Sequence, residues 1–174
     1  MKNDNRGYSL VEIIMVIAIL AIIATGAIVG IKLITGKPAE KCARQIQTVL
    51  TSCRTTTMGK LTARTQLYVD ASTGNIMVNE VVDSSVKTYA IGQSGVEVTY
   101  QLQGESTERA LPTSPELLSI SFDRSSGGVQ SLDASNPLSV QGMVLQYIYV
   151  RKGDKAFKLT VSSLTGRVDI EAIP

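Results

Sequence analysis

The chain has 174 residues, of which 44% are hydrophobic, and its formal net charge is +2. This length is enough for one modest hydrophobic core and excludes two large domains. Histidine is absent, which excludes Ser-His-Asp and Cys-His catalysis and most zinc sites, because these depend on an imidazole. The small net charge points to no particular class of partner.

The apolar excess is concentrated in an N-terminal block. Ile13 to Ile31 contains no charged residue, and a helix of this length would measure about 28 Å, close to the hydrocarbon thickness of a bilayer. A secretory signal peptide has a shorter apolar segment and a small-residue cleavage site, whereas Lys32 follows this block without such a site. A plain signal anchor fits the length but leaves the carboxylate of Glu12 without a partner.

The residues before and around Glu12 resemble a known processing signal. A basic leader that ends in Gly7, the stretch YSLVE and the long apolar run are similar to the class III signal of type IV pilins and type II secretion pseudopilins. In that family the mature chain usually begins with Phe. Here it would begin with Tyr8, a departure that keeps an aromatic ring.

This resemblance implies that residues 1–7 form a leader, which a prepilin peptidase removes by cutting between Gly7 and Tyr8 on the cytoplasmic side. The new N-terminal amine of Tyr8 would then be methylated. Glu12 would become the fifth residue of the mature chain and act as an assembly carboxylate that meets the N-terminal amine of a neighbouring subunit. Such a partner matters because a buried charge is tolerated when paired and strongly destabilising when unpaired.

The resemblance also implies a topology and a set of partners. Residues 8–35 would form a transmembrane and assembly helix, with a cytoplasmic N-terminus and an extracytoplasmic C-terminal domain before the chain enters a filament. The expected partners are the prepilin peptidase and methylase, other pilins or pseudopilins, an inner-membrane assembly platform and membrane lipid. The basic residues near the helix ends favour the opposite orientation, because Lys32, Lys37, Lys41 and Arg44 follow the helix. The cytoplasmic N-terminus therefore depends on the processing signal.

Residues 36–59 are predicted to form an amphipathic helix, the second half of the spine. Its apolar stripe has helical spacing and consists of Cys42, Ile46, Val49, Leu50 and Cys53. We expect the helix to end near residues 57–59, because a longer helix would place Lys60 and Arg64 on the apolar face. Cys42 and Cys53 would lie about 16 Å apart along it, too far for a disulfide within one subunit, so we expect two small buried hydrophobic side chains.

From residue 60 to 174 the pattern changes from helical to alternating, which predicts seven to nine short strands. Leu67 and Val69 are expected to face Val78 and Ile76 across a turn at residues 72–75. The other clear strands are predicted within 96–103, 117–122, 144–150, 156–161 and 167–172. An antiparallel sheet or small sandwich follows, and together with the N-terminal helix it gives an α+β fold.

Two segments of this region resemble GspH/FimT-type minor pseudopilins. They are SISFDRSSGGV at 119–129 and LTVSSLTGRVDI at 159–170. In that group a strand ending in Phe-Asp leads into a glycine turn, and the last hairpin closes on Gly-Arg-Val. The helical segment CARQIQTVLTSCR is similar to the same group less specifically, and Thr-Gly-Arg alone would equally suit a generic hairpin turn. The group implies a spine helix whose second half packs on a C-terminal sheet.

No catalytic or metal chemistry is expected. The chain has no phosphate-binding Gly-x-x-x-x-Gly-Lys and no calcium-loop pattern. Asp123 is expected to form a turn rather than to act in catalysis. The remaining carboxylates in the middle of the chain are scattered and are expected on a solvated surface: Glu80, Asp83, Glu97, Glu105 and Glu108. We therefore expect no enzyme, no cofactor and no metal.

Three functional hypotheses remain. The leading one, implied by the resemblance, is a structural subunit, a minor pilin or pseudopilin of a type IV pilus-like or type II secretion-type filament. The second is a pilin-like subunit for DNA uptake or adhesion, whose basic surface would contain Arg44, Arg54, Lys60 and Arg64. A solvated face is the favoured explanation of these residues, because Arg54 lies well around the helical wheel from Arg44. The third is a plain membrane-anchored extracytoplasmic protein.

Overall fold

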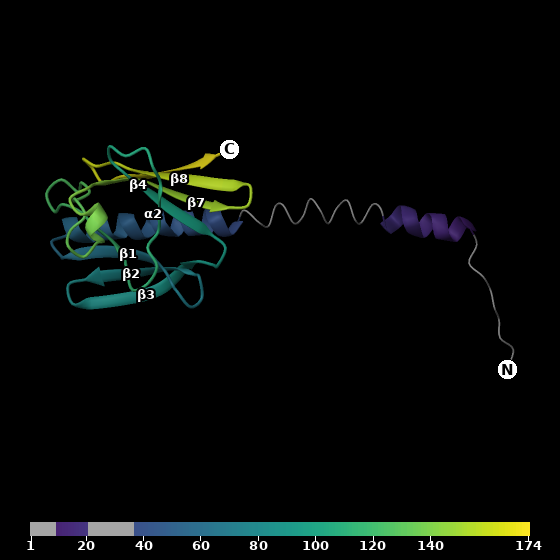
Figure 1. The fold of residues 1–174 in the computed structure, drawn as a ribbon, viewed down its shortest axis with the longest axis horizontal. Coiled ribbons are helices and arrows are strands. Elements are labelled where there is room, and N and C mark those ends of the chain that lie inside the picture. The colour runs from purple at the N-terminus through teal and green to yellow at the C-terminus, as the bar shows by residue number, and fades with distance from the viewer. Residues whose placement is uncertain (1–9, 21–36) are drawn as a thin grey trace. The chain divides into compact units, whose positions relative to one another are not determined.

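The computed structural model describes residues 10–20 and 37–174. Residues 10–20 are helical, and residues 36–174 form a compact unit of their own. The compact unit, shown in Figure 1, contains in chain order α2 (Lys37–Met58), β1 (Ala63–Val69), β2 (Ile76–Val82), β3 (Ser85–Gly92), β4 (Glu97–Leu102), β5 (Arg109–Ala110), β6 (Leu118–Ser121), the short 3-10 helix η1 (Leu138–Val140), β7 (Leu145–Lys152), β8 (Lys155–Val161) and β9 (Val168–Ile173).

The long helix α2 is amphipathic, as its sequence predicts. Its buried face consists of Ala39, Cys42, Ala43, Ile46, Val49, Leu50, Cys53 and Thr57. Pro38 lies in the first turn, where its missing N–H group breaks no helical hydrogen bond. The helix ends at Met58, and Lys60 then takes a φ of 76°. The predicted end near residues 57–59 is confirmed, and it keeps Lys60 and Arg64 off the apolar face.

Two antiparallel sheets follow α2. The first has the strand order β3-β2-β1-β6 and the second the order β5-β4-β7-β8-β9. The first hairpin has the predicted register, since Leu67 pairs with Val78 and Val69 with Ile76. The strands predicted in residues 96–172 correspond to β4, β6, β7, β8 and β9. The architecture is therefore α+β with two antiparallel sheets, as the alternation predicts.

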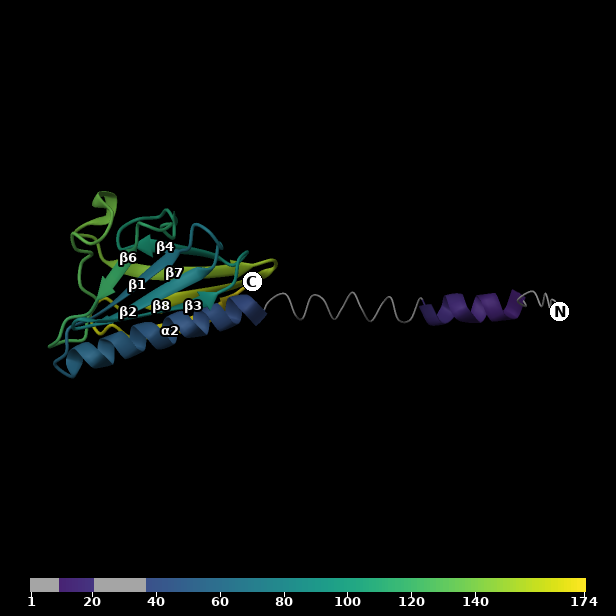
Figure 2. The same cartoon turned by 90° about the horizontal axis from the view of Figure 1, so that it is seen from below.

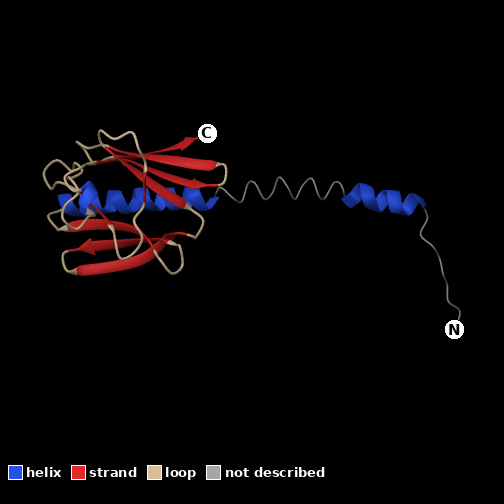
Figure 3. Cartoon of the chain, viewed as in Figure 1, coloured by secondary structure: helices blue, strands red, loops and turns tan. Residues whose placement is uncertain are grey.

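One helix packs against both sheets. α2 runs along one side of the strands (Figure 2) and contacts β1 and β3 of the first sheet and β7, β8 and β9 of the second. The Nε2 group of Gln47 donates a hydrogen bond of 2.9 Å to the carbonyl oxygen of Val168 at the start of β9. The buried apolar side chains of the helix and of both sheets form a single core. Figure 3 shows the strands of both sheets beside this helix.

The two cysteines are free and buried in this core. Gly92 at the end of β3 approaches α2 so closely that a Cβ at this position would lie 2.8 Å from the sulfur of Cys42. Burial raises the pKa of the Cys42 thiol to about 12. The prediction that both cysteines act as small buried hydrophobic residues of one helix is confirmed.

The predicted transmembrane and assembly helix over residues 8–35 lies mostly outside the described residues, which cover only 10–20 of it. Within residues 10–20 and 37–174, no helix combines the length and the apolar character that crossing a membrane requires.

Candidate functional site

The helix at residues 10–20 is apolar on all sides apart from Glu12. Its large apolar side chains are between 50% and 77% exposed, and they are Leu10, Val11, Ile13, Ile14, Met15, Val16, Ile17, Ile19 and Leu20. A helix that is apolar all round is stable in an environment that removes these side chains from water, such as a protein core or a membrane. This segment therefore needs lipid or other helices as its surroundings.

Glu12 is the charged residue of this helix. Its side chain is exposed, and apolar residues precede and follow it. In any surroundings that suit those neighbours, an ionised carboxylate needs a cationic or hydrogen-bonding partner. Gly7 and Tyr8, the predicted positions of cleavage and methylation, lie outside the described residues.

The basic residues near the end of α2 differ in their surroundings. Arg44 forms an ion pair of 2.9 Å with Glu40, one helical turn earlier. The Nε group of Arg54 is buried, has no hydrogen-bond partner among the described residues and lies close to the backbone of Gly127. Lys60 is exposed just after the helix ends. Arg44 and Arg54 are about 15 Å apart along the axis, so these cations do not form a compact cluster.

Arg64 on β1 lies beside carboxylates. It lines a cleft of about 280 Å³ together with Asp123 and Asp133. The hydroxyl of Ser135 donates a hydrogen bond to Asp133, and this bond and the charge of Arg64 hold the pKa of Asp133 below its usual range. The predicted basic surface is therefore partly neutralised at this position.

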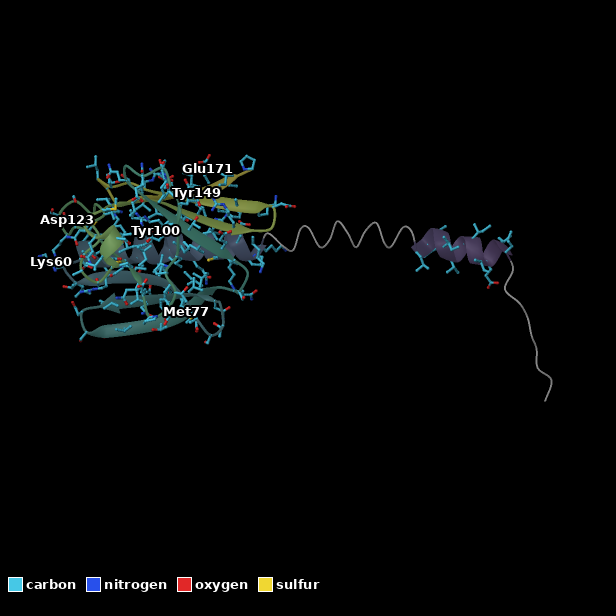
Figure 4. All side chains as sticks on the ribbon, viewed as in Figure 1. Lys60, Met77, Tyr100, Asp123, Tyr149 and Glu171 are labelled. Carbon is cyan, nitrogen blue, oxygen red and sulfur yellow. The ribbon has the colours of Figure 1, made fainter. Side chains whose placement is uncertain are left out.

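Asp123 forms a turn, as predicted, at the end of the unit where α2 ends (Figure 4). Its carboxylate accepts the N–H and hydroxyl groups of Ser125 and Ser126, at 2.6 to 3.0 Å. Hydrogen bonds from these serines hold the pKa of Asp123 well below its usual range. The N–H of Gly127, which has a φ of 70°, donates to the carbonyl oxygen of Asp123 at 2.9 Å.

The same turn occurs three times in the compact unit. Residues 70–75, 123–128 and 162–167 each begin with Asp or Ser and have Gly at the fifth position. In each, the glycine has a positive φ and its N–H donates to the carbonyl oxygen of the first residue. The N–H of that first residue donates to the carbonyl oxygen of the sixth, at 2.7 to 2.9 Å. Each turn is thus closed by its own backbone before it contacts the rest of the chain.

Two of these turns lie against each other. The N–H of Val129 donates to the carbonyl oxygen of Ser163 at 3.0 Å. A Cβ at Gly128 would lie 2.6 Å from the same oxygen, and a Cβ at Gly166 would overlap the carbonyl oxygen of Gly127. The structure therefore brings together the segments 119–129 and 159–170, which lie far apart in the sequence.

Glu105 and Glu108 differ from the prediction of a scattered solvated surface. Glu108 pairs with both terminal nitrogens of Arg151, each at 2.6 Å, and accepts the hydroxyl of Thr99. Glu105 pairs with Arg109 at 2.7 Å. Arg109 is only four residues from Glu105, whereas sheet pairing brings Arg151 to Glu108 from 43 residues away, which the local pattern does not reveal.

Residues 2–28 match the family model of the prokaryotic N-terminal methylation motif. The chain carries this processing signal. The match includes Gly7, Tyr8 and Glu12, and it supports a pilin-like subunit that is exported and processed. No curated protein and no solved structure matches the chain.

The methylation motif gives the apolar helix its context. The matched residues 2–28 contain the basic residues before Gly7, then Glu12 and most of the apolar run. No group of three or more histidine, cysteine, aspartate or glutamate side chains is placed to hold a metal ion within residues 10–20 and 37–174. The segment that matches the methylation motif is the candidate functional site.

Proposed function

We propose that the chain is a structural subunit, a minor pilin or pseudopilin of the GspH/FimT type, which enters a type IV pilus-like or type II secretion-type filament through its N-terminal helix. The observation that carries this proposal is the methylation motif at residues 2–28, in which Glu12 is the fifth residue after the predicted cut at Gly7.

Assembly in this proposal depends on one charge pair. Cleavage after Gly7 frees the amine of Tyr8, and methylation leaves it able to carry a positive charge. In a filament core with little water, the carboxylate of Glu12 pairs with the amine of a neighbouring subunit. The apolar side chains around Glu12 supply the packing, while the pair fixes the axial position, because a shifted helix would leave both charges buried and unpaired.

The exposed face of α2 supports a role in helix packing. It carries hydroxyl side chains in place of charges over about two and a half turns, at Thr48, Thr51, Ser52, Thr55 and Thr56. The hydroxyls of Thr48 and Thr55 already donate to the carbonyl oxygens four residues earlier, at 2.9 and 2.8 Å. A neighbouring helix that covered these two hydroxyls would therefore leave neither of them without a hydrogen-bond partner.

The contact between residues 119–129 and 159–170 supports the GspH/FimT assignment within this proposal. The segments that resemble that group in sequence lie against each other through Gly127, Gly128 and Gly166. Both segments thus serve one structural junction rather than two unrelated turns. The DNA-binding alternative has no comparable support, because Arg44 and Arg64 lie beside carboxylates.

The first test is the intact mass and the N-terminal peptide of the membrane-extracted protein, from cells with and without an active prepilin peptidase. We expect a chain that begins with N-methylated Tyr8 only when the peptidase is active. A chain that begins with Met1 in both cells would exclude the proposed processing and the filament role that depends on it.

The second test separates processing from assembly. In Glu12→Gln the side chain keeps its size and loses its charge, so we expect normal cleavage and a loss of incorporation into filaments. Glu12→Asp keeps the charge and should retain part of the incorporation. Glu40→Gln serves as the matched control, because its carboxylate is exposed on α2 and pairs with Arg44. Equal incorporation of Glu12→Gln and the wild-type chain would refute the charge pair.

A further inference from the structure

The end of the compact unit where α2 begins carries four lysines. Lys37 and Lys41 are exposed on the first two turns of α2. Lys152 and Lys155 come from the turn between β7 and β8, which lies at the same end of the unit in Figures 1 and 2. Residues from two distant parts of the sequence thus form one surface, which we call the lysine end.

A cleft lies beside the first pair of lysines, between the start of α2 and the end of β3. It has a volume of about 420 Å³, and Lys37, Lys41, Gln45, Asn75 and Gln93 line it with polar side chains. Its apolar wall consists of Pro38, Ala90, Ile91 and Gly92. The cleft is open enough for a small anionic group, and the lysines and amides offer it hydrogen-bond donors.

Hydrogen bonds connect this cleft to the second pair of lysines. The side-chain oxygen of Asn75 accepts the N–H of Ser94 at 3.0 Å. The carbonyl oxygen of Ser94 in turn accepts a hydrogen bond of 3.2 Å from the Nζ group of Lys152. The cleft and the β7–β8 turn are therefore parts of one continuous surface.

The positive charge of the lysine end is not compensated within the described residues. None of its four lysines forms an ion pair with a carboxylate of residues 10–20 or 37–174. Three acidic groups are nearby: Glu40, which lies between Lys37 and Lys41 and pairs with Arg44, Asp154 in the β7–β8 turn, and Asp70 in the turn that supplies Asn75. The carboxylate of Asp70 already accepts hydrogen bonds from Ser72. The surface therefore attracts anions.

The chain itself keeps this surface close to the apolar segment. Lys37 is six residues after Ile31, the last residue of the uncharged run. Six residues span at most about 20 Å when fully extended. When residues 13–31 lie in a bilayer, the start of α2 can therefore lie at most about 20 Å from the hydrocarbon boundary, a distance short enough to reach the headgroup layer.

We propose that the lysine end docks on the anionic headgroups of a phospholipid bilayer, with one headgroup phosphate held in the cleft between Lys37, Lys41 and Asn75. This inference rests on the proposed function, because it needs the N-terminal segment to be in the membrane before assembly. A basic residue near an anionic membrane strengthens binding by about fivefold. Docking would hold the compact unit against the membrane surface until the subunit enters the filament.

The test uses the fragment 37–174, which retains the complete core, since every buried apolar residue of the core lies between Ala39 and Val168. Its sedimentation is measured with vesicles of phosphatidylcholine alone and with vesicles that contain one third phosphatidylglycerol. We expect binding only to the second kind, and a loss of binding at high salt, because salt screens exposed charges.

Two double variants locate the surface. Lys37→Gln with Lys41→Gln should weaken binding by roughly twentyfold, as expected when two basic contacts are lost. Lys60→Gln with Arg124→Gln removes the same charge from exposed positions at the other end of the unit, where α2 ends, and should leave binding unchanged. If both double variants weakened vesicle binding equally, binding would depend only on the net charge of the fragment, and the proposal would be overturned.

Other results would also overturn it. Absence of binding to either vesicle, or equal binding to both, would exclude anionic headgroups. Self-association that Lys37→Gln with Lys41→Gln abolishes would assign the surface to a second copy of the chain. The fragment lacks the processing signal, so a failure of vesicle binding leaves the proposed function untouched. Vesicle binding together with an unprocessed N-terminus would instead exclude the filament role alone.

Discussion

The hydrogen bonds around Asp123 make the stability of the compact unit depend on pH. The pKa of Asp123 is lower in the folded chain than its usual value of 3.8, because Ser125 and Ser126 donate to the ionised form. The folded state is therefore favoured at pH values above the unfolded pKa. This contribution is lost as the pH falls through the folded pKa. We expect a lower urea midpoint at pH 3 than at pH 6.

The variant Asp123→Asn should reduce this pH dependence, because the amide does not titrate. At pH 6 it should be less stable than the wild type, and the two should converge as the pH falls. Asp154→Asn is the control, because Asp154 is exposed in the β7–β8 turn and accepts no hydrogen bond within the described residues. If Asp154→Asn reduces the pH dependence of the urea midpoint as much as Asp123→Asn does, the hydrogen bonds from Ser125 and Ser126 are not the cause of that dependence.

Gly166 supplies two things at once, a left-handed backbone and room for Gly127. Its φ is 63°, close to the 57° of Gly153 in the β7–β8 turn. A Cβ at Gly153 would meet nothing within 4 Å, whereas one at Gly166 would overlap the carbonyl oxygen of Gly127 and lie 2.8 Å from Phe122. Comparing alanine at these two positions therefore separates backbone strain from the close approach of the two turns.

We expect Gly153→Ala to lower the free energy of unfolding by about 1 to 2 kcal/mol, the cost of a left-handed residue with a side chain. Gly166→Ala should lower it by about 3 kcal/mol or more, because the turns at 123–128 and 162–167 must also separate. Urea unfolding at neutral pH measures both. If the two variants lost the same free energy of unfolding, the contact between these turns would contribute little to stability.

At the scale of single residues, the sequence predicts roles that depend on local bonding and misses those that depend on distant partners. Asp123 is recognisable as a turn former because its hydrogen bonds come from the next three residues. Glu108 is not recognisable as an ion-pair partner, because Arg151 is 43 residues away. The close contact between Gly166 and Gly127 likewise cannot be predicted from the sequence of either turn alone.

At the scale of secondary structure, elements with one buried face are predictable and β3 is not. The buried residues of α2 have helical spacing, and the first positions of β1 and β2 alternate between buried and half-buried, so the helix and the hairpin register follow from the pattern. β3 is an edge strand whose first four residues are all exposed. Without a buried face, its sequence has no alternation from which a strand could be predicted.

The burial of one face of α2 also determines the chemistry of its cysteines. Cys42 is fully buried, and Cys53 is 7% exposed and lines a cleft of about 210 Å³ between α2 and the first sheet. Burial raises the pKa of both thiols, so little reactive thiolate forms at neutral pH. We expect a maleimide to label Cys53 slowly and Cys42 only after unfolding.

Mass spectrometry of the labelled protein, with and without urea, measures both rates. The variants Cys42→Ala and Cys53→Ala assign each rate to one thiol. Rapid labelling of Cys42 in the folded protein would contradict the packing of α2 against Gly92 and Ile76. A disulfide in the purified chain would contradict the separation of the two cysteines along one helix.

At the scale of the whole compact unit, α2 makes one core out of two sheets. The sheets have separate strand orders, yet their buried residues form a single cluster with those of the helix. The alternation of the sequence predicts strands and hairpins. It does not predict their division into two sheets, because that division depends on which strand edges meet after the chain has folded. The turns at 123–128 and 162–167 join the sheets at the end where α2 ends.

A shared core predicts that both sheets unfold together. Ile46 is fully buried on α2, and Ile46→Ala should lower the free energy of unfolding by about 2 to 5 kcal/mol. Hydrogen exchange should then accelerate equally for the amides of β1 in the first sheet and β8 in the second, because both exchange through the same global opening. Thr51→Ala, on the exposed face of the same helix, should change neither the free energy of unfolding nor the exchange rates of these amides. If Ile46→Ala accelerated exchange in only one sheet, the two sheets would be separate cooperative units, and α2 would belong to one of them.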